Sequence, residues 1–255
     1  MELLKAMENI VRQAGEIVLS ATDILSVTKE KSSAADMVTA YDVKVEAFLK
    51  EKLLALLPEA IFFGEEEAEN QDPTHGWAFV VDPIDGTANF VRGLSQSAVS
   101  VGLLKDGQPE YAVILDPYRK ELYTAKRGMG AYCNGERIFV STRPLNQGIF
   151  GMGTAPYNKE LHGRTMELTA KLFERSCDFR RMGAAVLDLC ALAHGRIDAF
   201  FECILSPWDY TAGALLITEA GGRISTLEGD PIPYGEKCSV WASNAVNDHI
   251  RGEIL

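Results

Sequence analysis

Apolar residues near the start of the chain recur at the spacing of amphipathic helices. Between residues 3 and 18 every third or fourth position is apolar, and charged residues occupy the opposite face. The pattern predicts one helix over 3–18 and a second over about 39–57, which Pro58 ends. Stripes of this kind usually face the protein's own core, although a partner protein could also cover them.

From residue 61 the apolar residues form short runs separated by turn residues, which is typical of β-strands. Lys105-Asp106-Gly107 and Asn134-Gly135 both favour hairpin turns. Consecutive strands joined by tight turns predict an antiparallel meander, with the two helices covering one face. The expected strands are residues 61–63, 78–81, 98–104, 111–115, 121–125 and 137–140.

After about residue 145 the pattern changes to alternating strands and helices, which predicts an α/β unit with a mostly parallel sheet. The expected strands are 149–152, 179–182 and 199–201, and the expected helices are 159–174, 184–193 and 212–220. We therefore expect an α+β fold in two parts, residues 1–144 and 145–255. No low-complexity linker separates these parts, so they should pack tightly.

Composition narrows the class of protein. The chain has 255 residues, 47% of them apolar and 24% charged, which excludes disordered, collagenous and coiled-coil proteins. The net charge is −11 and no basic run is present, so neither nucleic acid nor an anionic membrane is an expected partner. The five cysteines form no C-x-x-C pair, and charged residues interrupt the N-terminus where a signal peptide would be apolar. We expect a cytoplasmic protein with reduced thiols.

Acidic residues gather at three places beside strand ends or helix starts. Glu65, Glu66 and Glu67 follow the strand at 61–63, and a second group extends from Asp82 to Asn89 after the strand at 78–81. Asp209 opens an apolar helix. Taken singly, the three groups could be a solvated acidic loop, a turn cap and a helix N-cap.

The second group has the chemistry of a metal and phosphate site. Asp82 and Asp85 are three residues apart, close enough to converge on one cation. Gly86 lets the backbone approach a ligand, and amides at a helical turn beginning at Thr87 would suit phosphate. Carboxylates beside a phosphate require a bridging divalent cation, and oxygen-only ligands favour magnesium over zinc. The two aspartates do not have the D-x-D spacing of phospho-aspartate enzymes, which favours direct attack by water.

Together these motifs resemble those of the magnesium-dependent, lithium-sensitive inositol monophosphatase family. The signatures of that family are similar to Gly64-Glu65-Glu66, to Asp82-Pro83-Ile84-Asp85-Gly86-Thr87 and to Trp208-Asp209-Tyr210-Thr211-Ala212-Gly213. Upstream the resemblance extends to Lys31-Ser32-Ser33, Asp36 and Asp42, and downstream to Gly183-Ala184-Ala185 and Glu202. It covers nearly the whole chain. Two positions depart from the usual pattern: Ser206, where several animal members have His, and Ala88, where Thr or Ser is common.

The resemblance implies a layered αβαβα fold, a homodimer and a site between the two halves. It also implies Mg²⁺-dependent hydrolysis of inositol 1-phosphate or a similar small phosphorylated polyol or sugar, with two to three ions per site. Fructose-1,6-bisphosphatase and histidinol-phosphatase activities of the same superfamily are alternatives. A different kind of alternative is a metal-binding regulatory protein without catalysis.

The resemblance also implies roles for individual residues. The metal ligands would be Glu65, Asp82, the carbonyl of Ile84, Asp85 and Asp209. The catalytic residues that act on the attacking water would be Asp42, Glu65 and Thr87. The substrate contacts would be Asp85, Gly86, Thr87, Ala185 and Glu202. The residues that support the site from behind would be Lys31, Asp36 and Glu66.

Overall fold

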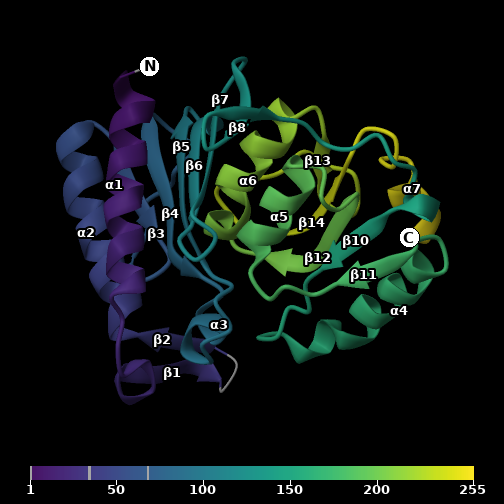
Figure 1. The fold of residues 1–255 in the computed structure, drawn as a ribbon, viewed down its shortest axis with the longest axis horizontal. Coiled ribbons are helices and arrows are strands. Elements are labelled where there is room, and N and C mark those ends of the chain that lie inside the picture. The colour runs from purple at the N-terminus through teal and green to yellow at the C-terminus, as the bar shows by residue number, and fades with distance from the viewer. Residues whose placement is uncertain (1, 34–35, 68) are drawn as a thin grey trace.

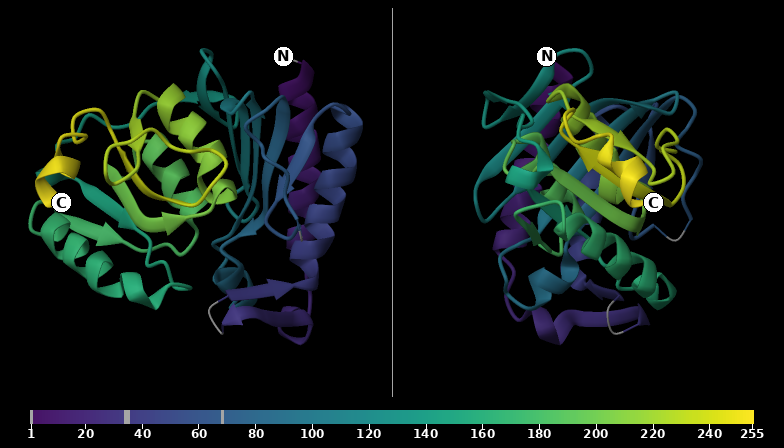
Figure 2. Two further views of the ribbon diagram at one scale, coloured as in Figure 1. Left: turned by 180° about the vertical axis from the view of Figure 1, so that it is seen from behind. Right: turned by 90° about the vertical axis from the view of Figure 1, so that its right-hand side faces the viewer.

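Helical layers and β-sheets alternate through the molecule (Figure 1). The computed structural model describes residues 2–33, 36–67 and 69–255. One outer layer contains α1 (Glu2–Leu19) and α2 (Ala40–Leu56). The middle helical layer contains α5 (Ala185–Ala193) and α6 (Pro207–Glu219). The opposite outer layer contains α4 (His162–Phe173) and α7 (Ile250–Ile254). The chain starts in the layer of α1 and ends in that of α7 (Figure 2). The α+β class and the αβαβα layering are confirmed.

The first sheet is the expected meander. Its seven strands lie in sequence order, and every neighbouring pair except the first is antiparallel. The strands are β3 (Ile61–Gly64), β4 (Trp77–Asp85), β5 (Ala98–Lys105), β6 (Gln108–Asp116), β7 (Glu121–Lys126), β8 (Gly130–Cys133) and β9 (Glu136–Ile138). The short helix α3 (Thr87–Val91) joins β4 to β5. Because β3 and β4 are parallel, their C-terminal ends lie together at one edge of the sheet.

The second sheet is mixed, whereas the sequence pattern predicts a mostly parallel one. Its order is β11-β10-β12-β14-β13, and the first two pairings are parallel while the last two are antiparallel. The strands are β10 (Ile149–Met152), β11 (Asp178–Arg180), β12 (Ala199–Leu205), β13 (Arg223–Ser225) and β14 (Cys238–Ser243). The described residues between β13 and β14 form no crossover helix of the kind that usually joins parallel strands, and these two strands pair in the antiparallel sense.

A small polar hairpin lies outside both sheets, next to α3 (Figure 1). It pairs β1 (Thr28–Ser33) with β2 (Asp36–Thr39), and its polar sequence gives no apolar alternation to predict it. Three 3₁₀ helices complete the structure: η1 (Ile24–Val27), η2 (Leu145–Gln147) and η3 (Lys159–Leu161). Within the ranges described, no helix combines the length and the apolar character needed to cross a bilayer.

Helix α6 is the centre of the fold. It is apolar around most of its circumference, and it is buried between the two sheets. It packs closely against α5 at Gly213, where an added Cβ would lie 2.5 Å from Leu189 Cδ1 and 2.8 Å from Leu189 Cβ. This packing fixes the positions of the N-termini of both middle helices.

We expect Gly213→Ala to lower the free energy of unfolding by about 1–2 kcal/mol, because overpacking α5 against α6 outweighs the gain in helix propensity. The matched control is Gly163→Ala in α4, where an added Cβ meets nothing within 4 Å. That change should be neutral or stabilising by up to about 1 kcal/mol. Denaturant titration of both variants measures the difference, and equal stability would contradict the close packing at Gly213.

Candidate active site

A bulge in β4 brings Asp82 and Asp85 together. Asp82 pairs with Ser100 of β5 and Asp85 with Ala98, so β4 contains one residue more than its partner between these positions. In a regular strand, side chains three residues apart point to opposite faces. The extra residue removes this alternation and lets both carboxylates face the same space.

Asp209 reaches the same space from the first turn of α6. The N-cap of this helix is Ser206, whose amide donates to Asp209 Oδ2 at 2.7 Å in a capping box. Asp209 is therefore the N3 residue of the capping box and not the N-cap itself. Candidate ligand oxygens of Asp82, Asp85 and Asp209 all lie within 4.8 Å of one another.

The three aspartates form an acidic cluster that can hold a cation. Burial raises the pKa of Asp82 well above its ordinary value, and the neighbouring Glu65 and Asp85 carboxylates raise it further. Asp82 Oδ1 is buried and has no hydrogen-bond partner. No ion pair within 4 Å between side chains that the structure describes involves these aspartates. The cluster therefore offers carboxylate oxygens, one of them buried without a hydrogen-bond partner. A hard divalent cation, which prefers oxygen ligands, fits such a cluster.

The parallel pairing of β3 and β4 puts Glu65 beside this cluster. Gly64 is in register with Val81, and the Glu65 amide donates to the Val81 carbonyl at 3.2 Å. The next amide, that of Glu66, donates to Glu46 Oε2 of α2 at 2.9 Å. The amides of the acidic loop thus anchor it to the backbone of β4 and to a side chain of α2.

Asp42 and Thr87 form a hydrogen-bonded pair. Thr87 Oγ1 lies 3.2 Å from Asp42 Oδ1 and 3.1 Å from the Ile84 carbonyl. The other carboxylate oxygen of Asp42 accepts bonds from the amide and the hydroxyl of Thr39, which is the N-cap of α2. Asp42 is fully buried, and this burial raises its pKa. The pair therefore combines a hydroxyl with a carboxylate that binds a proton more readily than a free one.

Gly86 shapes the turn between β4 and α3. Its φ of +83° is left-handed, and an added Cβ would lie 3.0 Å from both Ala184 Cβ and the Gln96 carbonyl. The first hydrogen bond of α3 runs from the Phe90 amide to the Gly86 carbonyl. Amides before Phe90 in this turn have no carbonyl of the helix to bind, so they suit an anion.

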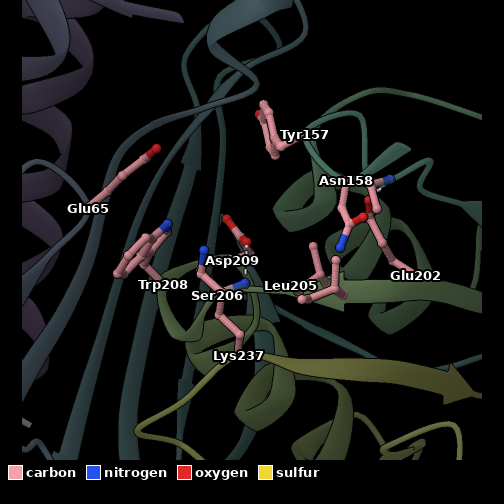
Figure 3. Close-up of a pocket in the computed structure, with 11 residues that line it drawn as sticks. Glu65, Tyr157, Asn158, Glu202, Leu205, Ser206, Trp208, Asp209 and Lys237 are labelled. Carbon is pink, nitrogen blue, oxygen red and sulfur yellow. Dashed lines mark hydrogen bonds between the residues drawn. The ribbon is translucent and has the colours of Figure 1, made fainter. Parts of the chain in front are cut away.

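Two neighbouring lobes, which share four lining residues, form the cleft around the cluster. The Thr87 lobe, of about 280 Å³, is lined among others by Gly86, Thr87, Arg92, Arg181 and Ala185. The Lys237 lobe, of about 460 Å³, is lined among others by Glu65, Asn158, Ser206, Trp208 and Lys237 (Figure 3). The residues that line both lobes are Tyr157, Glu202, Leu205 and Asp209.

Glu202 and the start of α5 complete the cleft. Glu202 is buried on β12, where its Oε1 accepts the Ala155 amide at 2.8 Å, and burial raises its pKa to about 7. Asp85 Oδ2 accepts the Val186 amide of α5 at 2.9 Å, and burial raises the pKa of Asp85 to about 7. Ala185, the first residue of α5, lines the Thr87 lobe.

The structure brings most of the expected residues to this cleft, and it adds one that sequence reasoning missed. Asp188 of α5 lines the Thr87 lobe, and its buried Oδ1 has no hydrogen-bond partner. Its signal in the sequence was a single acid within the apolar run 184–193. Lys31 and Asp36 belong to β1 and β2, but their side chains lie outside the described part of the structure.

Comparison with known proteins gives consistent matches over the whole chain. The model of the inositol monophosphatase family matches residues 1–254. "Nus factor SuhB" of Escherichia coli K12 is 37% identical over 230 residues, 89% of this chain and 86% of that protein. "Inositol-1-monophosphatase" of Rhizobium meliloti is 37% identical over 235 residues, 91% and 88% of the two chains. The crystal structure of the extragenic suppressor protein suhB from Bartonella henselae superposes with a TM-score of 0.89 at 31% identity, covering 100% of this chain and 97% of that one.

We expect the stability of the metal-chelated protein to fall between about pH 4 and pH 7. Asp85 and Glu202 have folded-state pKa values of about 7, above their unfolded values, so the folded state binds more protons in this window. Stability is therefore fully present below the window and is lost as the pH rises through it. Denaturant titrations in a chelator at successive pH values measure the slope.

Asp209→Asn should make this slope shallower and stabilise the chelated protein at pH 7 by on the order of 1 kcal/mol, because it removes one repelling charge. Asp230→Asn, in the exposed loop after β13, is the control and should keep the full slope. A chelated protein whose stability rises from pH 5 to pH 7 would contradict the raised pKa values.

Proposed function

Because the chain belongs to the inositol monophosphatase family, we propose that it is a Mg²⁺-dependent phosphomonoesterase acting on inositol 1-phosphate or a similar small polyol phosphate. Family membership supports phosphatase activity, and the name of the Rhizobium meliloti relative supports this substrate. The observation that carries the proposal is the convergence of Asp82, Asp85 and Asp209 within 4.8 Å, next to the Thr87–Asp42 pair. The same observation favours catalysis over a purely regulatory role. The expected homodimer and lithium sensitivity stay predictions.

The proposed metal ligands are Glu65, Asp82, the Ile84 carbonyl, Asp85 and Asp209. Bound Mg²⁺ would neutralise the charge of the phosphate and lower the pKa of the attacking water. The Ile84 carbonyl also accepts from Thr87 Oγ1, and its second lone pair is available to a ligand. Two to three ions would also relieve the repulsion among these carboxylates.

Thr87 and Asp42 are proposed to orient the attacking water and take its proton. A water that donates to Thr87 Oγ1 can lose a proton as Thr87 passes its own to Asp42 Oδ1, 3.2 Å away. The water oxygen then forms the new bond to phosphorus, and the bond from phosphorus to the alcohol oxygen breaks. The alcohol takes its proton from solvent. The raised pKa of Asp42 suits it to accept the first proton.

The two lobes would divide the substrate. Amides of Gly86 and Thr87 would bind the reacting phosphate, with Arg92 and Arg181 adding positive charge to the lobe that they line. Glu202 and the Ala185 amide would meet hydroxyl groups of the alcohol, since a carboxylate accepts hydrogen bonds from hydroxyls. A protein with a net charge of −11 needs such local cations to attract a phosphate dianion.

We expect Asp209→Asn to lower turnover of inositol 1-phosphate by on the order of 10²–10⁴ in Mg²⁺, because it removes a charged metal ligand. Asn can still accept the Ser206 amide, so the fold should survive. Phosphate release and thermal midpoint should be measured with Mg²⁺ and with a chelator, which should abolish wild-type activity.

The control for the helix cap is Ser206→Ala, which weakens the capping box of α6 but keeps the Asp209 carboxylate. It should lower the free energy of unfolding by about 1 kcal/mol, and its loss of activity should be far smaller than that of Asp209→Asn. Near-normal turnover of Asp209→Asn, or full wild-type activity after exhaustive chelation, would refute the metal assignment.

Glu202→Gln should change substrate preference more than it changes the chemical step. Its amide oxygen can still accept the Ala155 amide, but its contact with substrate hydroxyls becomes weaker. We expect kcat/KM for inositol 1-phosphate to fall by about tenfold, with a smaller loss for para-nitrophenyl phosphate, which has no hydroxyl groups to bind. Equal losses on the two substrates would show that Glu202 does not contribute to specificity.

A further inference from the structure

Lys237 places a positive charge in the wider lobe of the cleft. It comes from the loop between β13 and β14 and rises beside Trp208 and Asp209 (Figure 3). The residue is exposed, and the ion pairs found between described side chains do not include it. Its charge acts on Asp209, where it opposes the rise in pKa that burial causes, and its exposed ammonium group can also contact a ligand in this lobe.

The reacting phosphate is not the natural partner of this ammonium group. Gly86 and Thr87, which would bind that phosphate, line the Thr87 lobe together with Arg92 and Arg181. None of these four residues lines the Lys237 lobe. A phosphate monoester bound at Thr87 would extend its alcohol past Glu202 and Asp209, which are two of the four residues common to both lobes. Lys237 then faces the part of the alcohol that is remote from the reacting phosphorus.

The carboxylates that line the Lys237 lobe have other partners, so they leave Lys237 able to bind a ligand. Glu65 and Asp209 are proposed metal ligands, so bound cations would compete with Lys237 for their charge. Glu202 is buried, and its Oε1 is already engaged by the Ala155 amide. Asn158, Ser206 and Trp208 contribute neutral polar atoms to the same lobe. With Glu65 and Asp209 committed to cations and Glu202 Oε1 to the Ala155 amide, the ammonium group of Lys237 and these neutral polar atoms are suited to an anionic ligand.

We propose that Lys237 is a specificity residue that selects phosphate monoesters whose alcohol carries a second anionic group, either a carboxylate or another phosphate. This inference rests on the proposed phosphatase function and narrows its substrate class. The volume of the lobe, about 460 Å³ against about 280 Å³ for the Thr87 lobe, provides space for such a group. Ser206, which is small, leaves this side of Asp209 open.

The test compares pairs of substrates that differ in one anionic group. Glycerol 3-phosphate and 3-phosphoglycerate differ by a carboxylate, and fructose 6-phosphate and fructose 1,6-bisphosphate differ by a phosphate. For each pair, kcat/KM is measured at fixed free Mg²⁺. The value for the substrate with the second anionic group (the anionic member), divided by the value for the substrate without it, gives the preference. The wild type should prefer the anionic member of at least one pair, and the pair concerned identifies the carboxylate or the phosphate as the recognised group.

Lys237→Gln should lower that ratio by about tenfold or more, mainly through KM, because a charge-assisted contact is lost. Lys237→Arg should keep most of the preference, and Lys237→Glu should reverse it. Lys5→Gln is the matched control, since it removes the same charge from α1 on the outer layer, outside the residues that line either lobe. It should leave the ratio as in the wild type.

Equal losses on both members of each pair would overturn the proposal, because Lys237 would then act only on Asp209 and the metal site. The same change of ratio in Lys5→Gln would overturn it as well, since net charge alone would explain the preference. If no ester is hydrolysed, the proposed function fails separately. Calorimetric binding of the same pairs in Ca²⁺ to wild type and Lys237→Gln still decides the role of Lys237: equal affinities would exclude it.

Discussion

Repulsion among buried and half-buried carboxylates is the constraint on which the rest of this structure depends. Asp82, Asp85 and Asp209 have oxygens within 4.8 Å of one another, and burial makes each negative charge more costly than it would be in water. Such a cluster persists only on a scaffold that is stable without it. The scaffold here is the bulged end of β4 and the first turn of α6, a helix packed on both sides by sheets. Any cation that binds the folded cluster but not the unfolded chain will therefore also stabilise the fold.

The fold supplies part of the neutralising charge itself, through helix N-termini. Asp42 lies in the first turn of α2, Asp85 accepts an amide from the first turn of α5, and Asp209 lies in the first turn of α6. Thr87 is the first residue of α3. The amides of a helix N-terminus carry partial positive charge. The first turns of α3, α5 and α6 line the cleft, and that of α2 lies behind Thr87, which contacts Asp42. Each acid is thus held by a backbone bond or a capping box as well as by its place in the chain, which keeps its orientation fixed when the local charge changes.

The parts of the fold that the sequence predicted are those with strong local patterns. The amphipathic stripe of α1 and the turn-separated strands from β3 to β7 depend on neighbours within a few residues, and local periodicity reports them. Strand β14 pairs with β12 and β13, and its antiparallel direction depends on a loop whose path no local pattern encodes. The same limit applies to the site. The spacing of Asp82 and Asp85 indicated a cation, but their common orientation depends on a bulge that exists only in the pairing with β5. The positions of Asp188 and Lys237 in the cleft depend on tertiary contacts and had no comparable signal.

The division of the cleft separates what the reaction requires from what the substrate requires. The Thr87–Asp42 pair and the turn at Gly86 are tied to β4, α2 and α3, where a change of one residue would disturb several others. Lys237 instead lies on the loop between β13 and β14 and is exposed, so fewer contacts depend on it. A scaffold arranged in this way can keep one hydrolytic chemistry while its preference for the alcohol changes through the Lys237 lobe. Because Asp209 and Glu202 line both lobes, the alcohol of the substrate would still be recognised directly beside the cluster. Selection of the substrate and its correct placement for reaction are therefore coupled through these two shared residues.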